Sequence, residues 1–213
     1  MKRFDFDTVG TTMDEARKLS SVVDPPFVVV AERQTGGRGR QGKAWLSVDG
    51  AYLGTFCLPK KRGDLSGLSL AIGVGIIQGL KIKEAKLKWP NDIYLGGRKC
   101  AGILIEVQDK SVLVGIGINI NSAPDGFAKL DNLSLNSVNK DLDEIVPEIC
   151  EVFMMKGFGP WKETFNGLDF LKDKSLRAGE IKGMGTGVDD SGAYLIDVTK
   201  RVIAGSIEFD VSS

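Results

Sequence analysis

A glycine-rich, basic segment, GGRGRQGKAW at residues 36–45, is the part of the sequence that points most clearly to chemistry. It fits two phosphate-binding patterns at once, G-x-G-x-x-G and G-x-x-x-x-G-K. Both patterns require a helix directly after the glycines, because the helix N-terminus supplies N–H groups that hold phosphate. Residues 45–50 lead instead into an expected strand, and Ala44 stands where the second pattern has a magnesium-binding hydroxyl. We therefore reject both patterns.

Two arginines of this segment, Arg38 and Arg40, alternate with glycine. A guanidinium group is a rigid fork that can bind phosphate or carboxylate through two hydrogen bonds, so the pair suits an anionic ligand. Ordering such a loop costs on the order of 10 kcal/mol in backbone entropy. We expect it to close only on a ligand that offers several charged contacts. A solvated loop without function is the alternative, because exposed loops are often rich in glycine and basic residues.

A second segment, KWPND at residues 88–92, combines a cation, an aromatic ring, a rigid proline, an amide and a carboxylate. As structure alone, Trp89 would be core and Pro90 would end a strand before a turn. As function, Asp92 could orient Mg²⁺ or a ribose. The residues themselves leave both interpretations open.

Two further segments place polar groups near the ends of expected strands. In GGRKCAGILIE, residues 96–106, Lys99 is at the mouth of a strand and Gly102 would let a ligand approach the backbone. In GIGININ, residues 115–121, apolar residues alternate with glycine and asparagine, which places Asn119 on the same side as the glycines. A solvated lysine and a strand-end turn are the structural alternatives.

The composition excludes several kinds of chemistry. The chain of 213 residues contains no histidine, so Ser-His-Asp and Cys-His catalysis and histidine-ligated zinc do not apply to it. Its three cysteines, Cys57, Cys100 and Cys150, are far apart, which predicts neither a disulfide framework nor a C-x-x-C metal site. Any reaction must use lysine, arginine, carboxylates, amides and the backbone.

Charge and hydropathy predict a globular protein of the cytoplasm. Hydrophobic residues make up 42% of the chain and charged residues 26%, which is ordinary for a domain with a sizeable core. The 28 basic and 28 acidic side chains cancel, so no global field favours DNA or an anionic membrane. Gly73, Gly75 and Gln78 interrupt the longest apolar run, and the first residues lack the apolar stretch of a secretory signal. We expect neither DNA nor a membrane as partner.

Hydrophobic periodicity predicts a larger mixed part followed by a small β part. Strands are expected at 4–9, 27–31, 51–58, 86–89, 92–95, 100–107 and 111–120, and helices at 11–19, 65–80, 141–156 and 161–170. The third helix should be interrupted or restarted at Pro147. Three short β segments follow, at 180–188, 193–198 and 201–209. We therefore expect one domain at 1–173 and a small barrel or sheet at 174–213 that docks on it.

Taken in order, these motifs closely resemble the catalytic part of biotin protein ligases. The matching residues are Thr11-Thr12-Met13, Gln34, Gly37-Arg38-Gly39-Arg40 leading to Trp45, KWPND at 88–92, Lys99 to Glu106 as K-x-x-G-I-L-x-E, and Gly115 to Asn119 as GIGIN. The resemblance covers roughly residues 5–121 well and the C-terminal β segment only loosely. Five motifs in the same order make it highly specific.

The resemblance implies an α+β fold: a mixed β-sheet flanked by helices, as in class II synthetases, with a small C-terminal β-barrel-like domain. It implies a ligase that forms biotinyl-AMP and pyrophosphate from biotin and ATP. The enzyme would then pass biotin to a lysine of a biotin carboxyl carrier protein or domain. ATP, biotin and Mg²⁺ are the implied cofactors, and a homodimer is the implied assembly.

The resemblance also assigns residues to the two substrates. Lys99, Arg40 and Asp92 would be catalytic, with Asp92 serving either the metal or the incoming lysine. Biotin would be bound by Thr11, Thr12, Met13, Gln34, Gly37, Arg38, Gly39 and Gly102, and ATP by Arg40, Trp45, Lys88, Asn91 and Asn119.

Within these sets, particular contacts are implied. Thr12 and Gln34 would hold the ureido end of biotin, and Arg38 its tail. Trp45 would cover adenine. Charge that develops on the phosphoryl oxygens would be stabilised by Lys99 with Arg40 and Mg²⁺.

The chain departs from the family's pattern at three points. Gln41 stands where some members carry a third loop arginine. Met13 replaces the commoner asparagine, so a ligand contact there would be made by backbone. The chain begins directly at the catalytic segment, without the winged-helix DNA-binding region of bifunctional members, so we expect a monofunctional enzyme and no repressor role.

Two alternatives remain open. Lipoate or octanoate protein ligases resemble this chain in the single strand lysine but not in GRGR or KWPND. A noncatalytic biotin- or nucleotide-sensing module would need no transition-state cation, whereas this chain carries Lys99 with both loop arginines. Incubation with ATP and biotin, or lipoate, followed by detection of pyrophosphate would separate the three.

Overall fold

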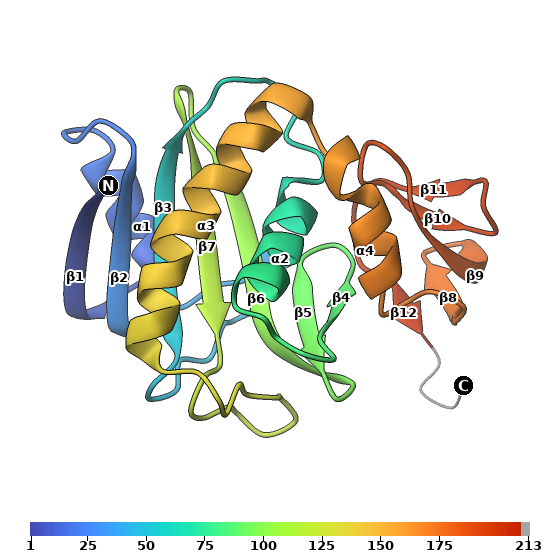
Figure 1. The fold of residues 1–213 in the computed structure, drawn as a ribbon, viewed down its shortest axis with the longest axis horizontal. Coiled ribbons are helices and arrows are strands. Elements are labelled where there is room, and N and C mark those ends of the chain that lie inside the picture. Colours follow the sequence, from blue (N-terminus) through green and yellow to red (C-terminus); the bar gives the residue numbers. More distant parts are fainter. Residues whose placement is uncertain (210–213) are drawn as a thin grey trace.

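The computed structural model describes residues 1–209, which form two β-sheets and the helices that pack on them (Figure 1). The larger sheet has seven strands in the order β1-β2-β3-β7-β6-β5-β4. β1 and β2 run parallel, and the other neighbouring strands run antiparallel. The strands are β1 (Lys2–Val9), β2 (Phe27–Gln34), β3 (Tyr52–Pro59), β4 (Lys86–Lys88), β5 (Asp92–Leu95), β6 (Arg98–Val107) and β7 (Ser111–Ile118). This mixed sheet confirms the α+β class.

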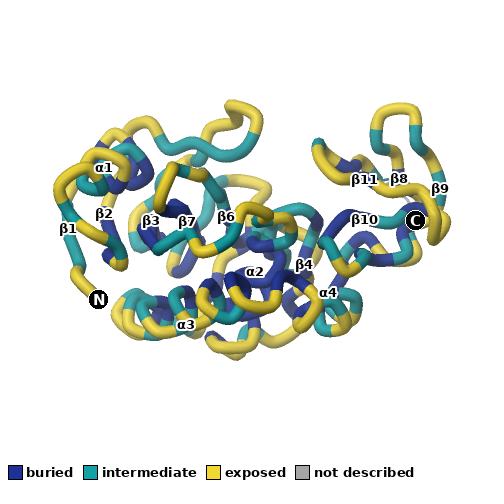
Figure 2. The backbone as a smooth tube through the Cα atoms, turned by 90° about the horizontal axis from the view of Figure 1, so that it is seen from above, coloured by how far each residue is buried: buried dark blue, intermediate teal, exposed yellow. Residues whose placement is uncertain are grey.

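Helices cover both faces of the larger sheet. α1 (Thr12–Leu19) lies on one face, whereas α2 (Leu68–Gly79) and α3 (Leu135–Lys156) lie on the other (Figure 2). α1 begins where the sequence predicts, because the Thr11 hydroxyl accepts a hydrogen bond from the Asp14 N–H and so caps the first turn.

The prediction that Pro147 interrupts the third helix is wrong. α3 continues through Pro147 without a break. A proline inside a helix costs about 3 kcal/mol, since it removes one hydrogen bond and crowds the preceding turn. The helix tolerates this cost because it buries an apolar stripe on both sides of the proline, with Val146 before it and Cys150 and Phe153 after it.

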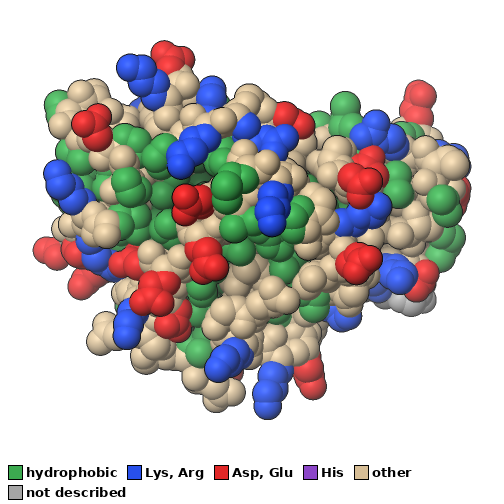
Figure 3. All heavy atoms as spheres, turned by 45° about the horizontal axis from the view of Figure 1, so that its top comes forward, with side chains coloured by type: hydrophobic (Ala, Val, Ile, Leu, Met, Phe, Trp, Pro, Cys, Tyr) green, Lys and Arg blue, Asp and Glu red, His purple; other side chains and the backbone are tan. Residues whose placement is uncertain are grey.

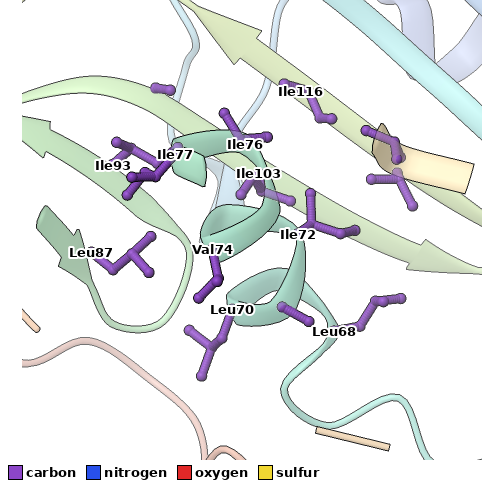
Figure 4. Packing of buried hydrophobic residues seen from close by; sticks show 14 of the residues in the cluster. Leu68, Leu70, Ile72, Val74, Ile76, Ile77, Leu87, Ile93, Ile103 and Ile116 are labelled. Carbon is purple, nitrogen blue, oxygen red and sulfur yellow. The ribbon is translucent and has the colours of Figure 1, made fainter. Parts of the chain in front are cut away.

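The apolar helix α2 forms the centre of the core. Figure 4 shows its side chains packed among Leu87, Ile93 and Ile103 of the neighbouring strands. On its other side, a Cβ added to Gly75 would lie 2.8 Å from Cγ1 of Ile149 in α3. Gly75, one of the glycines that break the apolar run, therefore lets the two helices approach closely.

The C-terminal part forms a second sheet of five antiparallel strands, in the order β11-β10-β9-β8-β12. Its strands are β8 (Ser175–Ala178), β9 (Ile181–Val188), β10 (Tyr194–Ile196), β11 (Lys200–Val202) and β12 (Glu208–Phe209). β8 escapes prediction because only one of its four side chains is buried, which leaves little alternation to recognise. The strand expected at 201–209 is two strands, since the chain turns at Gly205, whose φ is +104°. The described residues form an open sheet and not a closed barrel.

The second sheet is docked on the larger one next to α4 (Lys162–Leu168). Trp89 Nε1 donates to the Gly192 carbonyl at 3.0 Å, and the Tyr194 hydroxyl donates to Asp169 Oδ2 at 2.7 Å. A single hydrophobic cluster continues from α2 to Tyr194. The predicted domain boundary lies directly before β8 and stays a prediction, but these contacts fix the position of the second sheet.

The surface carries charges of both signs. Figure 3 shows lysine and arginine side chains interspersed with aspartate and glutamate over one face. In the described part of the chain, no helix is both long and apolar enough to cross a membrane. The three cysteines are free and buried.

Candidate active site

A cavity of about 640 Å³ is lined by residues of α1, the larger sheet, the glycine loop (residues 36–45) and the C-terminal segment. The predicted site residues that line it are Thr11, Thr12, Met13, Gln34, Arg38, Gly39, Arg40, Trp45, Lys88, Asn91, Asp92, Lys99, Gly102 and Asn119. Gly37 is the exception: it lies behind the lining, where an added Cβ would be 2.6 Å from the Trp45 carbonyl. The fold thus brings motifs that are far apart in the sequence to one place.

One part of the cavity, the α1 end, is lined by Thr12, Gln34 and Thr55. Gln34 Oε1 accepts hydrogen bonds from the Thr12 N–H at 2.7 Å and the Thr12 hydroxyl at 3.1 Å. The hydroxyls of Thr12 and Thr55 are 2.9 Å apart. These uncharged groups suit a ligand with neutral donors and acceptors. Sequence reasoning missed Thr55, because a single threonine in the buried strand β3 is an ordinary β residue.

Two predicted biotin-binding residues make structural contacts at this end. The Thr11 side chain caps α1, and the Met13 side chain packs over Gly115, where an added Cβ would be 2.7 Å from Met13 Cε. The Met13 side chain is therefore engaged with β7, which fits the expectation that a ligand contact there would be made by backbone.

The Arg38 side chain is bonded to acids of α1 and β6. Its two terminal nitrogens each lie 2.7 Å from a carboxylate oxygen of Asp14, and its Nε lies 3.5 Å from Glu106 Oε1. Arg17 contacts the same two carboxylates. The hydrogen bond from Arg38 is the main reason that the pKa of Asp14 lies below its usual value. The positive charges of Arg38 and Arg17 are therefore balanced by the negative charges of Asp14 and Glu106.

Trp45 lies over two glycines of neighbouring strands. A Cβ at Gly117 would be 2.5 Å from two indole carbons, and one at Gly102 would be 3.1 Å from another. Both positions therefore accommodate the indole, whereas the sequence suggested a ligand at Gly102. Trp45 Nε1 is buried and has no hydrogen-bond partner among the described residues. A buried donor without a partner costs stability, so an acceptor on a ligand would be favoured there.

The opposite part of the cavity, the lysine end, is lined by Arg40, Lys43, Lys88, Lys99 and Asp92. Besides these four cations and the paired Arg38, the charged side chains among the described lining residues are two carboxylates, Asp92 and Glu208. Burial lowers the pKa of Lys88, and the neighbouring Lys99 and Lys43 lower it further, while Asp92 opposes them. Burial also lowers the pKa of Arg40. Excess positive charge in a half-buried cavity favours a polyanionic ligand.

Asp92 and Lys99 form a close ion pair at this end. Lys99 Nζ lies 2.7 Å from Asp92 Oδ1, on the facing strands β5 and β6. The direction of the contact is unsuited to a hydrogen bond, so within residues 1–209 this buried oxygen has no hydrogen-bond partner. Lys99 Nζ also lies 5.4 Å from the Trp45 ring centroid, within cation–π range. Asp92 Oδ1 is therefore placed to accept a cation or an amine.

Asn91 and Asn119 hold local structure with their side-chain NH₂ groups. Asn91 Nδ2 donates to the Ile103 carbonyl at 2.8 Å, and Asn119 Nδ2 donates to the Ala128 carbonyl at 3.1 Å. Asn119 Oδ1 is buried, and no described residue donates to it. Asn119 therefore retains an acceptor for a ligand.

Sequence reasoning missed the C-terminal segment, residues 205–209, which lines the cavity. Lys88 Nζ lies 4.9 Å from the Phe209 ring centroid and 5.4 Å from that of Tyr94. The Ser206 hydroxyl donates to Gln41 Oε1 of the glycine loop at 3.1 Å. Phe209 belongs to no motif, so its sequence gave no signal that it would reach Lys88.

Comparison with known proteins agrees with this geometry. Residues 4–122, more than half of the chain, match the sequence model of the Biotin/lipoate A/B protein ligase family. The biotin–[acetyl-CoA-carboxylase] ligase of Mycobacterium tuberculosis is 35% identical, over 93% of this chain and 84% of the relative. The corresponding ligase of Paracoccus denitrificans is 31% identical, over 87% and 90%.

A solved structure shows the same fold. The biotin protein ligase from Aquifex aeolicus in complex with biotin and ATP is 26% identical and has a TM-score of 0.87, covering 98% of this chain and 99% of that one. The family match, the similarity along nearly the whole chain and the assembled cavity agree. The chain belongs to the Biotin/lipoate A/B protein ligase family.

Proposed function

We propose that this protein is an ATP-dependent biotin protein ligase. It forms biotinyl-5′-AMP from biotin and ATP and then transfers biotin to a lysine of a biotin carboxyl carrier protein or domain. The observation that carries the proposal is a single cavity with neutral hydrogen-bonding groups at one end and excess positive charge at the other. The names of the relatives, and the biotin and ATP bound in the Aquifex structure, support it.

In the first half-reaction, a biotin carboxylate oxygen attacks the α-phosphorus of ATP, and the bond to pyrophosphate breaks. Negative charge grows on the phosphoryl oxygens, and Lys99 and Arg40 are the cations at this end that would stabilise it. Lys88 and Lys43 would hold the departing pyrophosphate. The step needs little acid-base catalysis, which suits a chain without histidine.

The α1 end would hold the ring system of biotin. Thr12 and Gln34 would bond the ureido group, with Thr55 fixing the Thr12 hydroxyl. The backbone of residues 37–39 and of Met13, together with Gly102, would complete this end. On the nucleotide side, Trp45 would cover adenine, and Asn119 Oδ1 would accept a hydrogen bond from it.

In the second half-reaction, the carrier lysine attacks the carbonyl of biotinyl-AMP and AMP leaves. The amine must lose a proton to attack, and the Asp92 carboxylate, 2.7 Å from Lys99 Nζ, is the acidic side chain at this end. Its oxygen without a hydrogen-bond donor would accept that proton or orient the amine.

Magnesium fits the same position. In residues 1–209, no group of three or more acidic or cysteine side chains converges on one point. Mg²⁺ commonly takes one or two carboxylates together with substrate phosphates, so Asp92 would hold it jointly with ATP. When bound, the ion neutralises phosphate charge. The homodimer, which depends on the resemblance, and the cytoplasmic location, which is expected from charge and hydropathy, also belong to this proposal.

Pyrophosphate release tests the function directly. The purified protein should release pyrophosphate from ATP with biotin and fail to do so with lipoate or octanoate, since an apolar tail has no partner for Thr12 and Gln34. A purified biotin carboxyl carrier domain should then be labelled at one lysine. Pyrophosphate release with lipoate but not with biotin would establish the lipoate ligase instead, and binding of biotin without any release would establish a sensing module.

A further inference from the structure

The two arginines of the glycine loop differ in their surroundings. Arg40 lines the lysine end, where the nearest acid that affects it is Asp92. The Arg38 guanidinium is already occupied by Asp14 of α1, through two hydrogen bonds of 2.7 Å, and lies 3.5 Å from Glu106 of β6. Three of the five guanidinium N–H donors are used in this way, and the fork of the two terminal nitrogens is occupied by Asp14 and not open to a substrate carboxylate.

Few polar side-chain contacts hold the glycine loop to the rest of the protein, and those of Arg38 are among them. Three backbone hydrogen bonds join the loop to itself: Gly39 donates to Lys43, Lys43 to Arg40, and Trp45 to Gly37. Among the described residues, the side-chain hydrogen bonds that leave residues 37–44 come from Arg38 and from Gln41, which meets Ser206. Arg38 is therefore the main polar link between the loop and α1.

Asp14, the acid that Arg38 bonds, belongs to α1, which also carries the proposed biotin-binding residue Thr12. Asp14 lies in the first turn of α1, two residues after Thr12, which bonds Gln34 at the α1 end. Arg38 follows Gly37, which lies against Trp45 and the Gln34 side chain. A contact between Arg38 and Asp14 therefore fixes the loop backbone relative to the groups that would hold biotin.

We propose that Arg38 is a positioning residue: it holds the glycine loop on α1 through Asp14 and Glu106 and acts on biotin through the loop backbone, without its guanidinium touching the substrate. The inference rests on the proposed function and assigns a role to Asp14, which no motif marks. It replaces the direct contact between Arg38 and the biotin tail that the resemblance implies.

A double-mutant cycle separates the two roles of Arg38. If Arg38 acts through Asp14, Asp14→Asn removes part of the interaction that Arg38→Gln removes, so the double variant should be no worse than Arg38→Gln alone. If Arg38 touches biotin, Asp14→Asn should leave biotin use nearly unchanged, because the arginine remains. Glu106→Gln should change biotin use in the same direction as Asp14→Asn but by less, because Arg38 lies 3.5 Å from Glu106 and 2.7 Å from Asp14.

Glu15→Gln is the matched control for Asp14→Asn. Glu15 is the other acid in the first turn of α1, so both variants lose the same interaction with the helix dipole. Its partner is Lys18 on the same helix at 2.8 Å, and not the loop. The control should therefore behave like the unmodified protein in the loop and towards biotin.

The first measurement is amide hydrogen exchange in the ligand-free protein. Arg38→Gln and Asp14→Asn should each speed exchange in residues 36–45 by roughly 3- to 10-fold, the range expected for charge-assisted hydrogen bonds at half-exposed positions. Exchange in β3 and β7 should not change, which shows that the variants are folded. Unchanged loop exchange in Asp14→Asn would overturn the proposal.

The second measurement is the KM for biotin in the pyrophosphate assay. Both single variants and the double variant should raise it by a similar factor, with kcat little changed. Independent, multiplying effects, or an effect of Arg38→Gln alone, would overturn the proposal. If the unmodified protein releases no pyrophosphate, the proposed function fails, whereas loop exchange still decides whether Arg38 holds the loop on α1.

Discussion

The α1 end and the lysine end of the cavity differ in how their charges are balanced. At the α1 end, Arg38 is matched by Asp14 and Glu106, and the groups that face the cavity are hydroxyls and an amide. At the lysine end, four cations share one nearby carboxylate, Asp92, which is paired with Lys99. Arginine and lysine in one cavity thus have two uses: where the charges balance they hold the structure, and where positive charge is in excess it is left for a ligand. The difference makes predictions that sequence motifs alone would not make.

The largest effect is expected at Lys99. Lys99→Ala should reduce biotinyl-AMP formation by at least ~100-fold, as removal of one preorganised donor at a transition state typically does. Pyrophosphate release in single-turnover reactions measures it. Lys83→Ala, on an exposed turn away from the cavity, is the control and should be unaffected. Near-normal pyrophosphate release by a folded Lys99→Ala protein would contradict the proposal that the cations of the lysine end act on the ligand.

A smaller effect is expected at Arg40. Biotinyl-AMP is a reactive mixed anhydride, and under the proposed function Arg40 is the loop cation that would bind its phosphate. Arg40→Gly removes a charge-assisted hydrogen bond and adds backbone freedom, so release of the adenylate should quicken by ~10-fold or more. Biotin that appears on an added albumin, without any carrier domain, measures this release. Formation of adenylate with no faster labelling of albumin would mean that Arg40 does not retain it.

Phe209 should have a still smaller effect, confined to ATP. Its ring lies over Lys88, and a cation–π contact of this kind contributes about 0.5–2 kcal/mol. Phe209→Leu keeps an apolar side chain but removes the ring, so the KM for ATP should rise roughly 3-fold, while the KM for biotin should not change. Phe209→Tyr should restore the KM for ATP. Equal rises for both substrates would show that the two ends are not independent.

The last prediction concerns stability and not activity, and tests how the second sheet, which completes only the lysine end, is held. Burial raises the pKa of Asp169, the partner of Tyr194, to about 6 from an ordinary 3.8. Between these values the folded protein keeps a proton that the unfolded chain has lost. The free energy of unfolding should therefore fall as pH rises through this window and then stay level.

Urea unfolding at pH 4.5 and pH 7 checks this slope. Asp169→Asn keeps the shape and cannot titrate: its Oδ1 can still accept from the Leu171 N–H, and its NH₂ group can donate to the Tyr194 hydroxyl in place of the bond that the carboxylate accepts. It should therefore lack a contribution on the order of 2 kcal/mol, since one pKa unit corresponds to about 1.4 kcal/mol. The same slope in both proteins would show that Asp169 does not keep a proton in the folded state.

Most of the fold could be predicted, because it follows from local patterns. The buried run at Phe27 gave β2, Thr11 gave the start of α1, and Gly96-Gly97 with positive φ gave the turn between β5 and β6. The failures are elements that long-range packing decides. α3 passes Pro147 because of its contacts with the core. β8 is a strand because it pairs with β9 and β12, and β12 is a strand because it pairs with β8.

The site residues show the same division between what local sequence determines and what long-range packing decides. Residue type and order by themselves determined which residues form the cavity, including Thr12, Gln34 and Lys99, since five motifs can be recognised without coordinates. Only the tertiary structure decided what each charge faces: Asp14 lies 24 positions from Arg38, and Phe209 lies 121 positions from Lys88. A sequence fixes the charge of a side chain, but its use depends on whether the fold brings an opposite charge within bonding distance, and that is a property of packing.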